Sequence, residues 1–168
     1  VMNQFLVHYE TGEPMPQALV DKIKNASKFN QGFKTVEYLE SALVDMKLHL
    51  AGDADIDPDA FEKAALEEIG APKEIVMRHR TPQFGHIFAG EGYAAGYYSY
   101  LWADAITADA AEAFEEAGSY YDKETAKRLH DDIMSVGDSI DPAEGFRKFR
   151  ARDVDTSALL RDRGFPVD

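Results

Sequence analysis

A histidine, four tyrosines and four glycines gather between residues 85 and 105, in the stretch GHIFAGEGYAAGYYSYLWADA. If residues 92–105 form a helix, Tyr93, Tyr97 and Tyr100 fall within about 60° of one another around its axis, because each residue turns the chain by about 100°. Phenol hydroxyls on one face suit a carboxylate or a developing oxyanion, since each hydroxyl donates a hydrogen bond. The glycines before the helix allow close approach and can carry His86 toward the same face. We therefore predict a site for negative charge along this helix edge.

The alternative is that the aromatic stripe packs in the core, as aromatic residues at helical spacing usually do. The presence of Tyr rather than Phe or Leu at all three positions counts against this alternative, because each buried hydroxyl needs a hydrogen-bond partner. Tyr98, Leu101 and Trp102 fall on other faces of the predicted helix and can pack there.

Three further patterns resemble known sites but lack part of what those sites need. The acidic run DADIDPD resembles the start of an EF-hand loop, yet its sixth and twelfth positions hold Pro58 and Ala64 instead of Gly and Glu. GEGYAA, residues 90–95, fits a dinucleotide fingerprint, but no strand–helix–strand unit surrounds it. No two of the five histidines are three or four residues apart and cysteine is absent, so we expect no complete metal site within the chain.

Helices are the elements that must position these residues. The hydrophobic pattern predicts helices at about 15–29, 30–50, 60–70, 92–117, 123–137, 141–152 and 155–164, with at most one short strand near residues 83–88. In the second of these, an apolar stripe is expected to be buried: Phe33, Val36, Leu39, Leu43, Met46 and Leu50. Four aspartates precede predicted helices and are expected to cap them: Asp57, Asp122, Asp141 and Asp155. The sequence predicts an all-α, multi-helical single domain over residues 1–168.

Composition narrows the classes of partner. A chain of 168 residues with 45% hydrophobic residues can bury a core, and a net charge of −13 argues against nucleic acid as a partner. No apolar run approaches the ~20 residues that cross a bilayer, so we expect no membrane span. A short basic run, Arg147, Lys148, Arg150 and Arg152, is expected to be solvated or paired with nearby acids.

Several stretches together resemble one enzyme family. FGHIFAGEGYAAGYYSYLWAD is similar to the C-terminal segment of the thimet oligopeptidase family of zinc peptidases, in particular its bacterial peptidyl-dipeptidase and oligopeptidase A branch. HYETGEPMPQALVDKI, FNQGFKTVEYLESALVDMKLH and FRKFRARDVDTSALLRDRG resemble the family's segments after its zinc site and at its chain end. The resemblance covers nearly the whole chain. It implies the C-terminal helical part of a peptidase catalytic domain, whose His-Glu-x-x-His motif and third zinc ligand lie in an upstream part of the same polypeptide.

The resemblance also implies roles for individual residues. Tyr100 matches a tyrosine that donates a hydrogen bond to the tetrahedral oxyanion, and His86 matches a histidine that assists there or binds the substrate backbone. Tyr93 and Tyr97 match tyrosines that contact substrate, and Tyr97 is our choice for the terminal carboxylate of a peptide. Gly90 and Gly92 are expected to line the bound substrate. One departure is the seven-residue step from His86 to Tyr93, since the family's commoner form is shorter by one or two residues.

These expectations combine into one hypothesis and one alternative. The hypothesis is a zinc-dependent oligopeptidase or peptidyl-dipeptidase that hydrolyses short peptides, of which this chain alone is inactive and binds no metal. The resemblance favours a cytoplasmic enzyme, with the periplasm as the other compartment. The alternative is a free-standing helical module that binds a peptide or a small acid without catalysis.

Overall fold

The computed structural model describes residues 5–167 and shows a protein built of helices. The α-helices are α2 (Gln17–Ser27), α3 (Gln31–Leu50), α4 (Pro58–Glu68), α5 (Ser99–Glu116), α6 (Lys123–Leu129), α7 (Pro142–Arg150) and α8 (Ser157–Arg163). Within residues 5–167 no strand forms, and the extended pairing is limited to an isolated bridge between Val7 and Pro14. The predicted all-α class is therefore confirmed, while positions 1–4 and 168 of the predicted unit lie outside the described residues.

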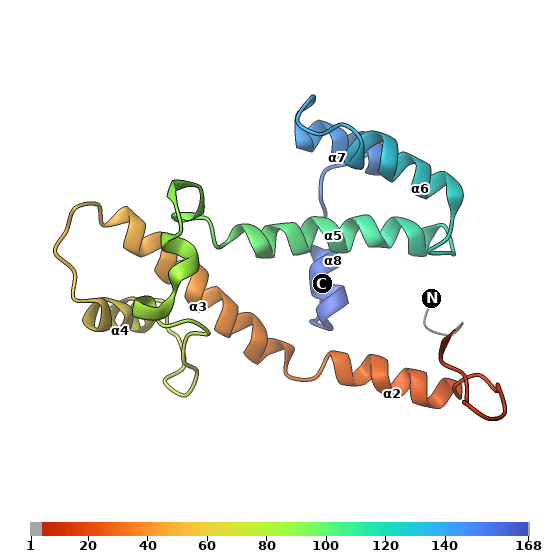
Figure 1. Ribbon diagram of the computed structural model, residues 1–168, viewed down its shortest axis with the longest axis horizontal. Coiled ribbons are helices and arrows are strands. Elements are labelled where there is room, and N and C mark those ends of the chain that lie inside the picture. The colour runs from red at the N-terminus through yellow and green to blue at the C-terminus, as the bar shows by residue number, and fades with distance from the viewer. Residues whose placement is uncertain (1–4, 168) are drawn as a thin grey trace.

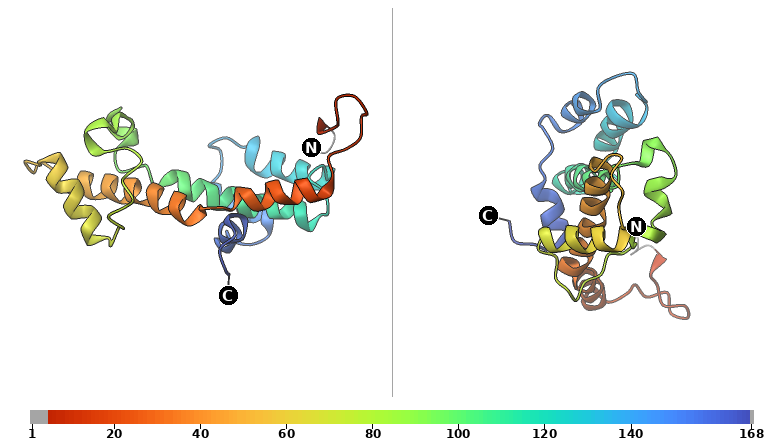
Figure 2. Two further views of the ribbon diagram at one scale, coloured as in Figure 1. Left: turned by 90° about the horizontal axis from the view of Figure 1, so that it is seen from below. Right: turned by 90° about the vertical axis from the view of Figure 1, so that its left-hand side faces the viewer.

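The helices are arranged along one long dimension (Figures 1 and 2). Helices α2 and α3 follow one another, α5 runs beside them through the centre, and α8 packs across α5 (Figure 1). Helix α4 lies beside the C-terminal half of α3, at the left in Figure 1, whereas α6 and α7 lie above the C-terminal half of α5. The loop segment between α4 and α5, which carries the glycines and tyrosines, therefore lies against α3 at the end away from α6.

The predicted aspartate caps are confirmed, because each carboxylate accepts a hydrogen bond from a free amide at a helix start. The pairs are Asp57 with the amide of Ala60 at 2.8 Å, Asp122 with Thr125 at 2.7 Å, Asp141 with Ala143 at 2.8 Å and Asp155 with Ser157 at 2.9 Å. A different constraint fixes α7 against the π-helical segment His130–Met134 that continues α6. A Cβ added at Gly145 would lie 2.6 Å from the main-chain oxygen of Asp132, so only glycine permits this approach.

The predicted helix at 92–117 is wrong at its start, because α5 begins at Ser99. Residues 91–93 form a short 3₁₀ turn, and Ala95 has φ +55°, a left-handed conformation that cannot continue a right-handed helix. The chain turns tightly after this point, and the absence of a Cβ at Gly96 helps, because a Cβ there would lie only 3.3 Å from the main-chain oxygen of Tyr93. Tyr93 and Tyr97 therefore lie in a loop, and the predicted single helical edge does not exist.

The segment before that loop also differs from the expected short strand. Residues Thr81–Gln83 and Gly85–Phe88 form two 3₁₀ turns, η1 and η2, instead of extended chain. Ile87 is 1% exposed and Phe84 is 3% exposed, so both turns are anchored by buried apolar side chains. This anchoring places His86 at the protein surface on a short, compact turn.

The prediction for the buried face of α3 is wrong. Phe33, Leu43 and Leu50 are 48%, 42% and 77% exposed, whereas the buried positions of α3 include Glu40 and Asp45. The reason is that the polar face of α3 binds the loop before α5 through side-chain hydrogen bonds, described below. The apolar core beside it is small and joins Val44, Ala65 and Met77 with the partly buried Phe61 and Leu66.

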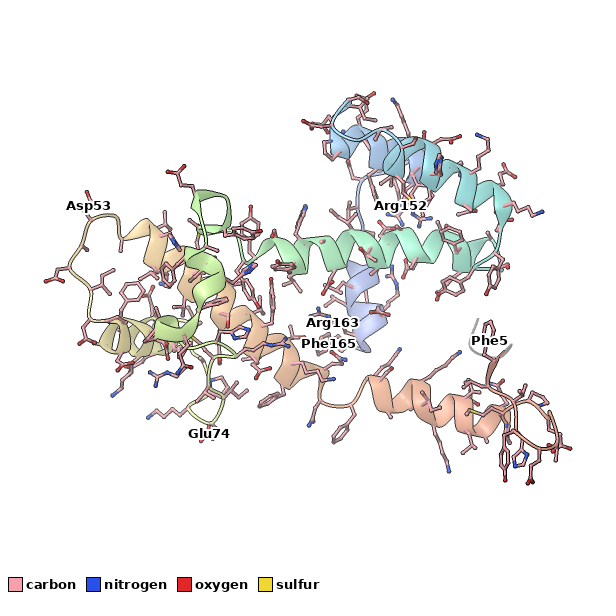
Figure 3. The ribbon with its side chains drawn as sticks, viewed as in Figure 1. Phe5, Asp53, Glu74, Arg152, Arg163 and Phe165 are labelled. Atoms are coloured by element: carbon pink, nitrogen blue, oxygen red, sulfur yellow. The ribbon has the colours of Figure 1, made fainter. Side chains whose placement is uncertain are left out.

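The basic run near the C-terminus pairs with acids, as predicted. Asp109 of α5 is fully buried and accepts hydrogen bonds from Arg150, Arg152 and the amide of Asp155. Arg150 also makes a two-point ion pair with Glu116 at 2.7 and 2.8 Å. Figure 3 shows Arg152 between α5 and α7, where these contacts tie the segment before α8 to α5.

Glu40 is a buried carboxyl group that destabilises the fold. It is 1% exposed, and no group among the described residues lies within hydrogen-bonding distance of either carboxyl oxygen. Burial, together with the charge of Glu37, raises the pKa of Glu40 above 4.5. Since a raised folded-state pKa favours the protonated form, the stability of the protein falls as pH rises above 4.5 and this group must ionise.

We therefore expect Glu40→Met, which keeps the length and removes both oxygens, to stabilise the protein. The expected gain in unfolding free energy is about 1–3 kcal/mol at pH 8, by relief of an unpaired buried polar group. Urea denaturation at pH 5 and pH 8 measures the gain, which should be larger at pH 8. Equal stability of the two proteins at pH 8 would contradict this account of Glu40.

Within residues 5–167, none of the helices combines the length and the apolar character that a bilayer crossing requires.

Candidate active-site cavity

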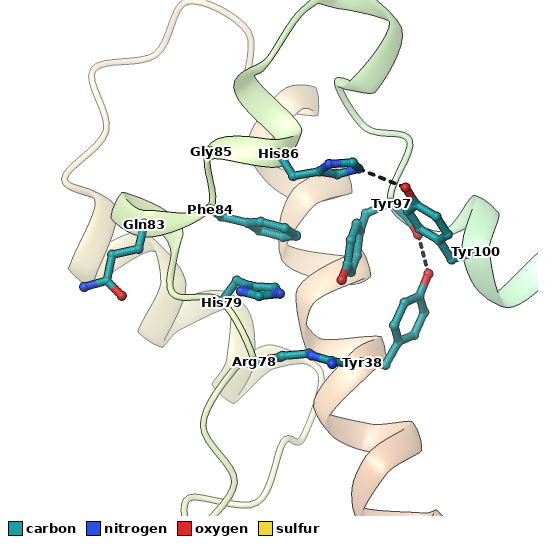
Figure 4. Close-up of a pocket in the computed structure, with 9 residues that line it drawn as sticks. All are labelled: Tyr38, Arg78, His79, Gln83, Phe84, Gly85, His86, Tyr97 and Tyr100. Atoms are coloured by element: carbon teal, nitrogen blue, oxygen red, sulfur yellow. Dashed lines mark hydrogen bonds between the residues drawn. The ribbon is translucent and has the colours of Figure 1, made fainter.

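A cavity of about 570 Å³ opens between α3, the segment before η2 and the start of α5 (Figure 4). Its wall carries phenol, imidazole and guanidinium groups, together with the ring of Phe84. The polar side chains are Tyr38, Arg78, His79, Gln83, His86, Tyr97 and Tyr100. A wall with this composition offers hydrogen-bond donors and positive charge, and the described residues that line it include no carboxylate.

His86 and Tyr100 form the central pair of the cavity. The Tyr100 hydroxyl lies 3.2 Å from Nε2 of His86, although the two residues come from η2 and α5. Tyr93 packs edge-on against the imidazole with ring centres 4.8 Å apart. The Tyr97 and Tyr100 rings also meet edge-on, with ring centres 5.4 Å apart. The structure thus brings together His86, Tyr93, Tyr97 and Tyr100, by a loop and a helix start instead of by one helical face.

The rings are accessible, which argues against the alternative of a core stripe. Tyr93 and Tyr100 are each 49% exposed, and Tyr97 is only partly buried. Gly90 and Gly92 are exposed as well, and a Cβ at either would meet no atom within 4 Å. They lie beside the cavity and do not form its wall, so a role for them in lining the substrate stays a prediction.

Residues on α3 complete the cavity and were missed from the sequence. The hydroxyl of Tyr38 donates to the main-chain oxygen of Tyr97 and accepts from the amide of Leu101 at 3.2 Å, while the Tyr38 and Tyr97 rings stack at 5.2 Å. Asp45, two turns further along α3, accepts from the amides of Ala95 and Tyr97. Tyr38 and Asp45 are seven residues apart and share a helix face, a spacing that the sequence shows but the apolar pattern of α3 conceals.

Arg78 and His79 were also missed, because a cation in an irregular segment carries no pattern. Arg80, two residues further on, is bound to Glu62 at 2.8 Å and to Asp59 at 2.9 Å, and Glu62 also accepts from the amide of Thr81. These contacts fix the segment and leave Arg78 on the cavity wall. His79 stacks on Phe84 with ring centres 5.0 Å apart.

The phenols of the cavity are hydrogen-bond donors at neutral pH. Burial raises the pKa of Tyr97 above 10.0, against the opposing charge of Arg78, and neighbouring Tyr100 adds to the rise. Burial likewise raises the pKa of Tyr38 above 10.0, although its hydrogen bond from the Leu101 amide opposes the change. Both groups stay protonated over the physiological range and do not themselves act as bases. Tyr97 can donate its hydroxyl hydrogen to an anion, whereas Tyr38 gives its own to the main-chain oxygen of Tyr97.

Among the residues that the structure describes, no three His, Asp or Glu side chains converge in a way that could hold a metal ion. His86 and His79 face the same cavity, but no carboxylate joins them there. The cavity can therefore hydrogen-bond a polar ligand and stabilise negative charge on it, whereas its described side chains do not form a complete set of metal ligands.

Comparison with known proteins gives consistent matches along the chain. The family model described as Peptidase family M3 matches residues 1–165. The chain is 42% identical to oligopeptidase A of Escherichia coli K12, over 94% of this chain and 23% of that protein. It is 37% identical to dipeptidyl carboxypeptidase of E. coli K12, over 99% of this chain and 25% of that protein, and 26% identical to saccharolysin of Saccharomyces cerevisiae. The chain thus spans about a quarter of the length of the first two curated relatives.

Proposed function

Because this chain belongs to peptidase family M3, we propose that it forms the substrate-binding and oxyanion-stabilising wall of a zinc-dependent oligopeptidase or peptidyl-dipeptidase. The observation that carries the proposal is the pair of His86 and Tyr100, joined at 3.2 Å in a cavity whose wall also carries the hydroxyl of Tyr97 and the guanidinium of Arg78. Hydrolysis of a peptide bond places negative charge on the former carbonyl oxygen, and fixed donors at that oxygen stabilise it.

In this proposal each predicted residue has a separate task. Tyr100 donates its hydroxyl hydrogen to the developing oxyanion, and His86 holds that hydroxyl in place or donates to the oxyanion itself. Tyr97 and Tyr93 contact the peptide, with Tyr97 and the nearby guanidinium of Arg78 suited to a carboxylate. The loop of Gly90 and Gly92 leaves room for a peptide main chain next to Tyr93, because a Cβ added at either glycine would meet no atom within 4 Å.

Zinc enters the proposal through another part of the polypeptide. The described residues provide no metal site, so we assign zinc no ligand in this chain and derive no step through it. We infer that the ligands lie upstream, in the larger part of the protein that the curated relatives contain and this chain does not cover. The chain alone is accordingly expected to be inactive.

Exposed apolar side chains support an intramolecular partner of this kind. Helices α2 and α3, with the turn between them, carry large hydrophobic residues that are 42–77% exposed: Leu19, Ile23, Phe29, Phe33, Leu43 and Leu50. Large apolar side chains that are exposed close together commonly mark a surface on which another part of a protein packs. We propose that the upstream part of the same polypeptide packs on it, which brings the zinc ligands to the cavity from outside this chain.

The proposed function is tested with the full-length polypeptide that contains these residues. We expect it to hydrolyse short fluorogenic peptides, to lose activity to the background rate in a zinc chelator, and to regain it when zinc is added. Peptide binding without any hydrolysis in the zinc-loaded protein would instead support a binding module. Full activity after verified removal of all metal would contradict a zinc peptidase.

A further inference from the structure

We propose that Asp45, assisted by His49, is the positioning residue that holds the Tyr97 loop and the start of α5 in the catalytic geometry. This inference rests on the proposed function for its catalytic consequence. Its structural content, that one buried carboxylate holds the loop before α5, rests on the contacts alone.

The loop before α5 has little internal structure to hold it. Its regular parts are 3₁₀ turns of three and four residues, and Ala95 adopts φ +55°, which is unfavourable for a residue with a Cβ. Tyr97 contributes one ring to the cavity, and Tyr100 follows it by three residues at the first turn of α5. Any change in the main chain at residues 95–97 therefore moves both rings.

Asp45 captures two main-chain amides of this loop. The amide of Ala95 donates to Oδ1 at 3.2 Å and the amide of Tyr97 donates to Oδ2 at 3.0 Å, so each carboxylate oxygen has its own donor. The Asp45 side chain is 1% exposed, which shields these hydrogen bonds from water. Hydrogen bonds to a charged acceptor are stronger than those between neutral groups, and the two together fix the left-handed turn at Ala95.

His49 supports the carboxylate from one helical turn away. Its Nδ1 lies 2.8 Å from Oδ1 of Asp45 and 3.3 Å from the amide nitrogen of Ala95. We place the ring hydrogen on Nδ1, because it then points at the shorter contact, the carboxylate, and the Ala95 amide keeps Asp45 as its acceptor. The ring also contacts Phe88 of η2 with centres 5.8 Å apart, which links the support to the turn that carries His86.

The same face of α3 holds the other end of the Tyr97 residue. Tyr38 donates to the Tyr97 main-chain oxygen, seven residues before Asp45 on α3, and accepts from the Leu101 amide in α5. Tyr97 is thus held at its N–H by Asp45 and at its C=O by Tyr38. A carboxylate lost at position 45 takes its acceptor from two part-buried amides, while the contact of Tyr38 remains.

The test compares Asp45→Asn with Asp109→Asn in the full-length polypeptide. Asparagine keeps the shape of the side chain but offers one acceptor oxygen, so Asp45→Asn loses one of the two amide contacts. We expect kcat to fall about 10- to 100-fold with a smaller change in KM, on the scale of losing groups that orient catalytic side chains. Asp109→Asn changes an equally buried aspartate that also accepts a main-chain amide, far from the cavity, and is expected to keep kcat at temperatures where it stays folded.

A double-mutant comparison separates positioning from general damage. If Asp45 acts through the tyrosines, Asp45→Asn should lower kcat less than threefold in a Tyr97→Phe, Tyr100→Phe background, where the hydroxyls that it positions are gone. A full 10- to 100-fold loss in that background would overturn the proposal. His49→Gln, which leaves Asp45 in place, is expected to lower kcat about 3- to 10-fold and supplies the comparison should Asp45→Asn fail to fold.

Amide hydrogen exchange gives a readout that needs no activity. Asp45→Asn, or His49→Gln in its place, should speed exchange of at least one of the Ala95 and Tyr97 amides at least tenfold while amides in α8 keep their rates. Unchanged exchange at both amides would overturn the proposal even in an active enzyme. Faster exchange in a protein that hydrolyses no peptide would instead place the failure in the proposed function.

Discussion

Replacing Tyr100 with phenylalanine in the full-length polypeptide is expected to lower kcat about 10²–10³-fold, with KM changed by less than a few-fold. The substitution removes one hydroxyl and keeps the ring, which packs against Tyr97 at 5.4 Å and is 49% exposed, so the fold should be unaffected. The magnitude is that of losing one preformed donor to an oxyanion, which acts in the transition state and little in the ground state. Steady-state kinetics with a short peptide measures both constants.

Tyr98→Phe is the matched control for this prediction. Tyr98 is the neighbouring tyrosine, is 54% exposed and does not line the cavity, so its hydroxyl should contribute nothing to turnover. We expect the kcat of Tyr98→Phe to stay within a factor of two of the unmodified enzyme. If Tyr100→Phe behaves in the same way, Tyr100 is not the oxyanion donor and the role assigned to the cavity is wrong.

The candidate site could be predicted from residue types but its construction could not. Tyrosine content and glycine content pointed to residues 85–105, and the structure does gather His86, Tyr93, Tyr97 and Tyr100 around one cavity. The assumed cause, one helical edge, was wrong because a buried carboxylate more than 45 residues earlier in the chain binds the loop amides. Such a long-range contact leaves no periodic signal near residue 95.

The same contact explains the error on α3. An apolar stripe normally marks the buried face of a helix, yet on α3 the buried face carries Glu40, Ser41 and Asp45. Asp45 is buried because it accepts hydrogen bonds from two loop amides, and three residues of the apolar stripe, Phe33, Leu43 and Leu50, are exposed in the described part of the chain. Periodicity identifies the apolar face of a helix, but it does not say whether another part of the chain covers that face. The predicted burial of the apolar face of α3 was therefore wrong.

Helix starts, by contrast, were predictable because their physics is local. An aspartate before a helix accepts free amides two or three residues later, and the contacts of Asp57, Asp122 and Asp141 follow this rule. Asp155 accepts the amide of Ser157, and its second oxygen is bound by Arg161 at 2.9 Å. Hydrogen bonds from Arg161 and Ser157 lower the pKa of Asp155 to about 2, so this cap stays ionised throughout the physiological range.

The largest expected loss of stability follows from Asp109→Asn. Asp109 is 0% exposed and binds Arg150, Arg152 and the Asp155 amide, so a neutral side chain removes the buried carboxylate that these groups share and leaves Arg150 with Glu116 alone. Breaking a buried ion pair from one side costs about 3–5 kcal/mol. Native-state hydrogen exchange at amides of α8 measures the loss, because this network attaches the segment before α8 to α5.

Asp104→Asn provides the comparison on the same helix. Asp104 pairs with Arg163 at 2.9 Å but is 58% exposed, and exposed pairs contribute about 0–1 kcal/mol. Figure 3 shows Arg163 at α8, so both substitutions remove a contact between α5 and the C-terminal segment. A similar loss in the two variants would mean that burial of Asp109 adds nothing to the attachment.

The pH dependence of Asp109 has a definite sign. Burial favours its neutral form, but hydrogen bonds from Arg152 and the Asp155 amide outweigh burial and lower its pKa below 3.8. Because the folded-state pKa is lowered, the contribution of ionised Asp109 to stability is complete above the unfolded pKa of 3.8. It is lost as pH falls through the folded pKa. The difference in unfolding free energy between the natural protein and Asp109→Asn should therefore be constant from pH 6 to 8 and shrink only below about pH 4. A difference that shrinks between pH 6 and 8 would show that some other group governs this contact, since neither arginine nor this aspartate titrates there.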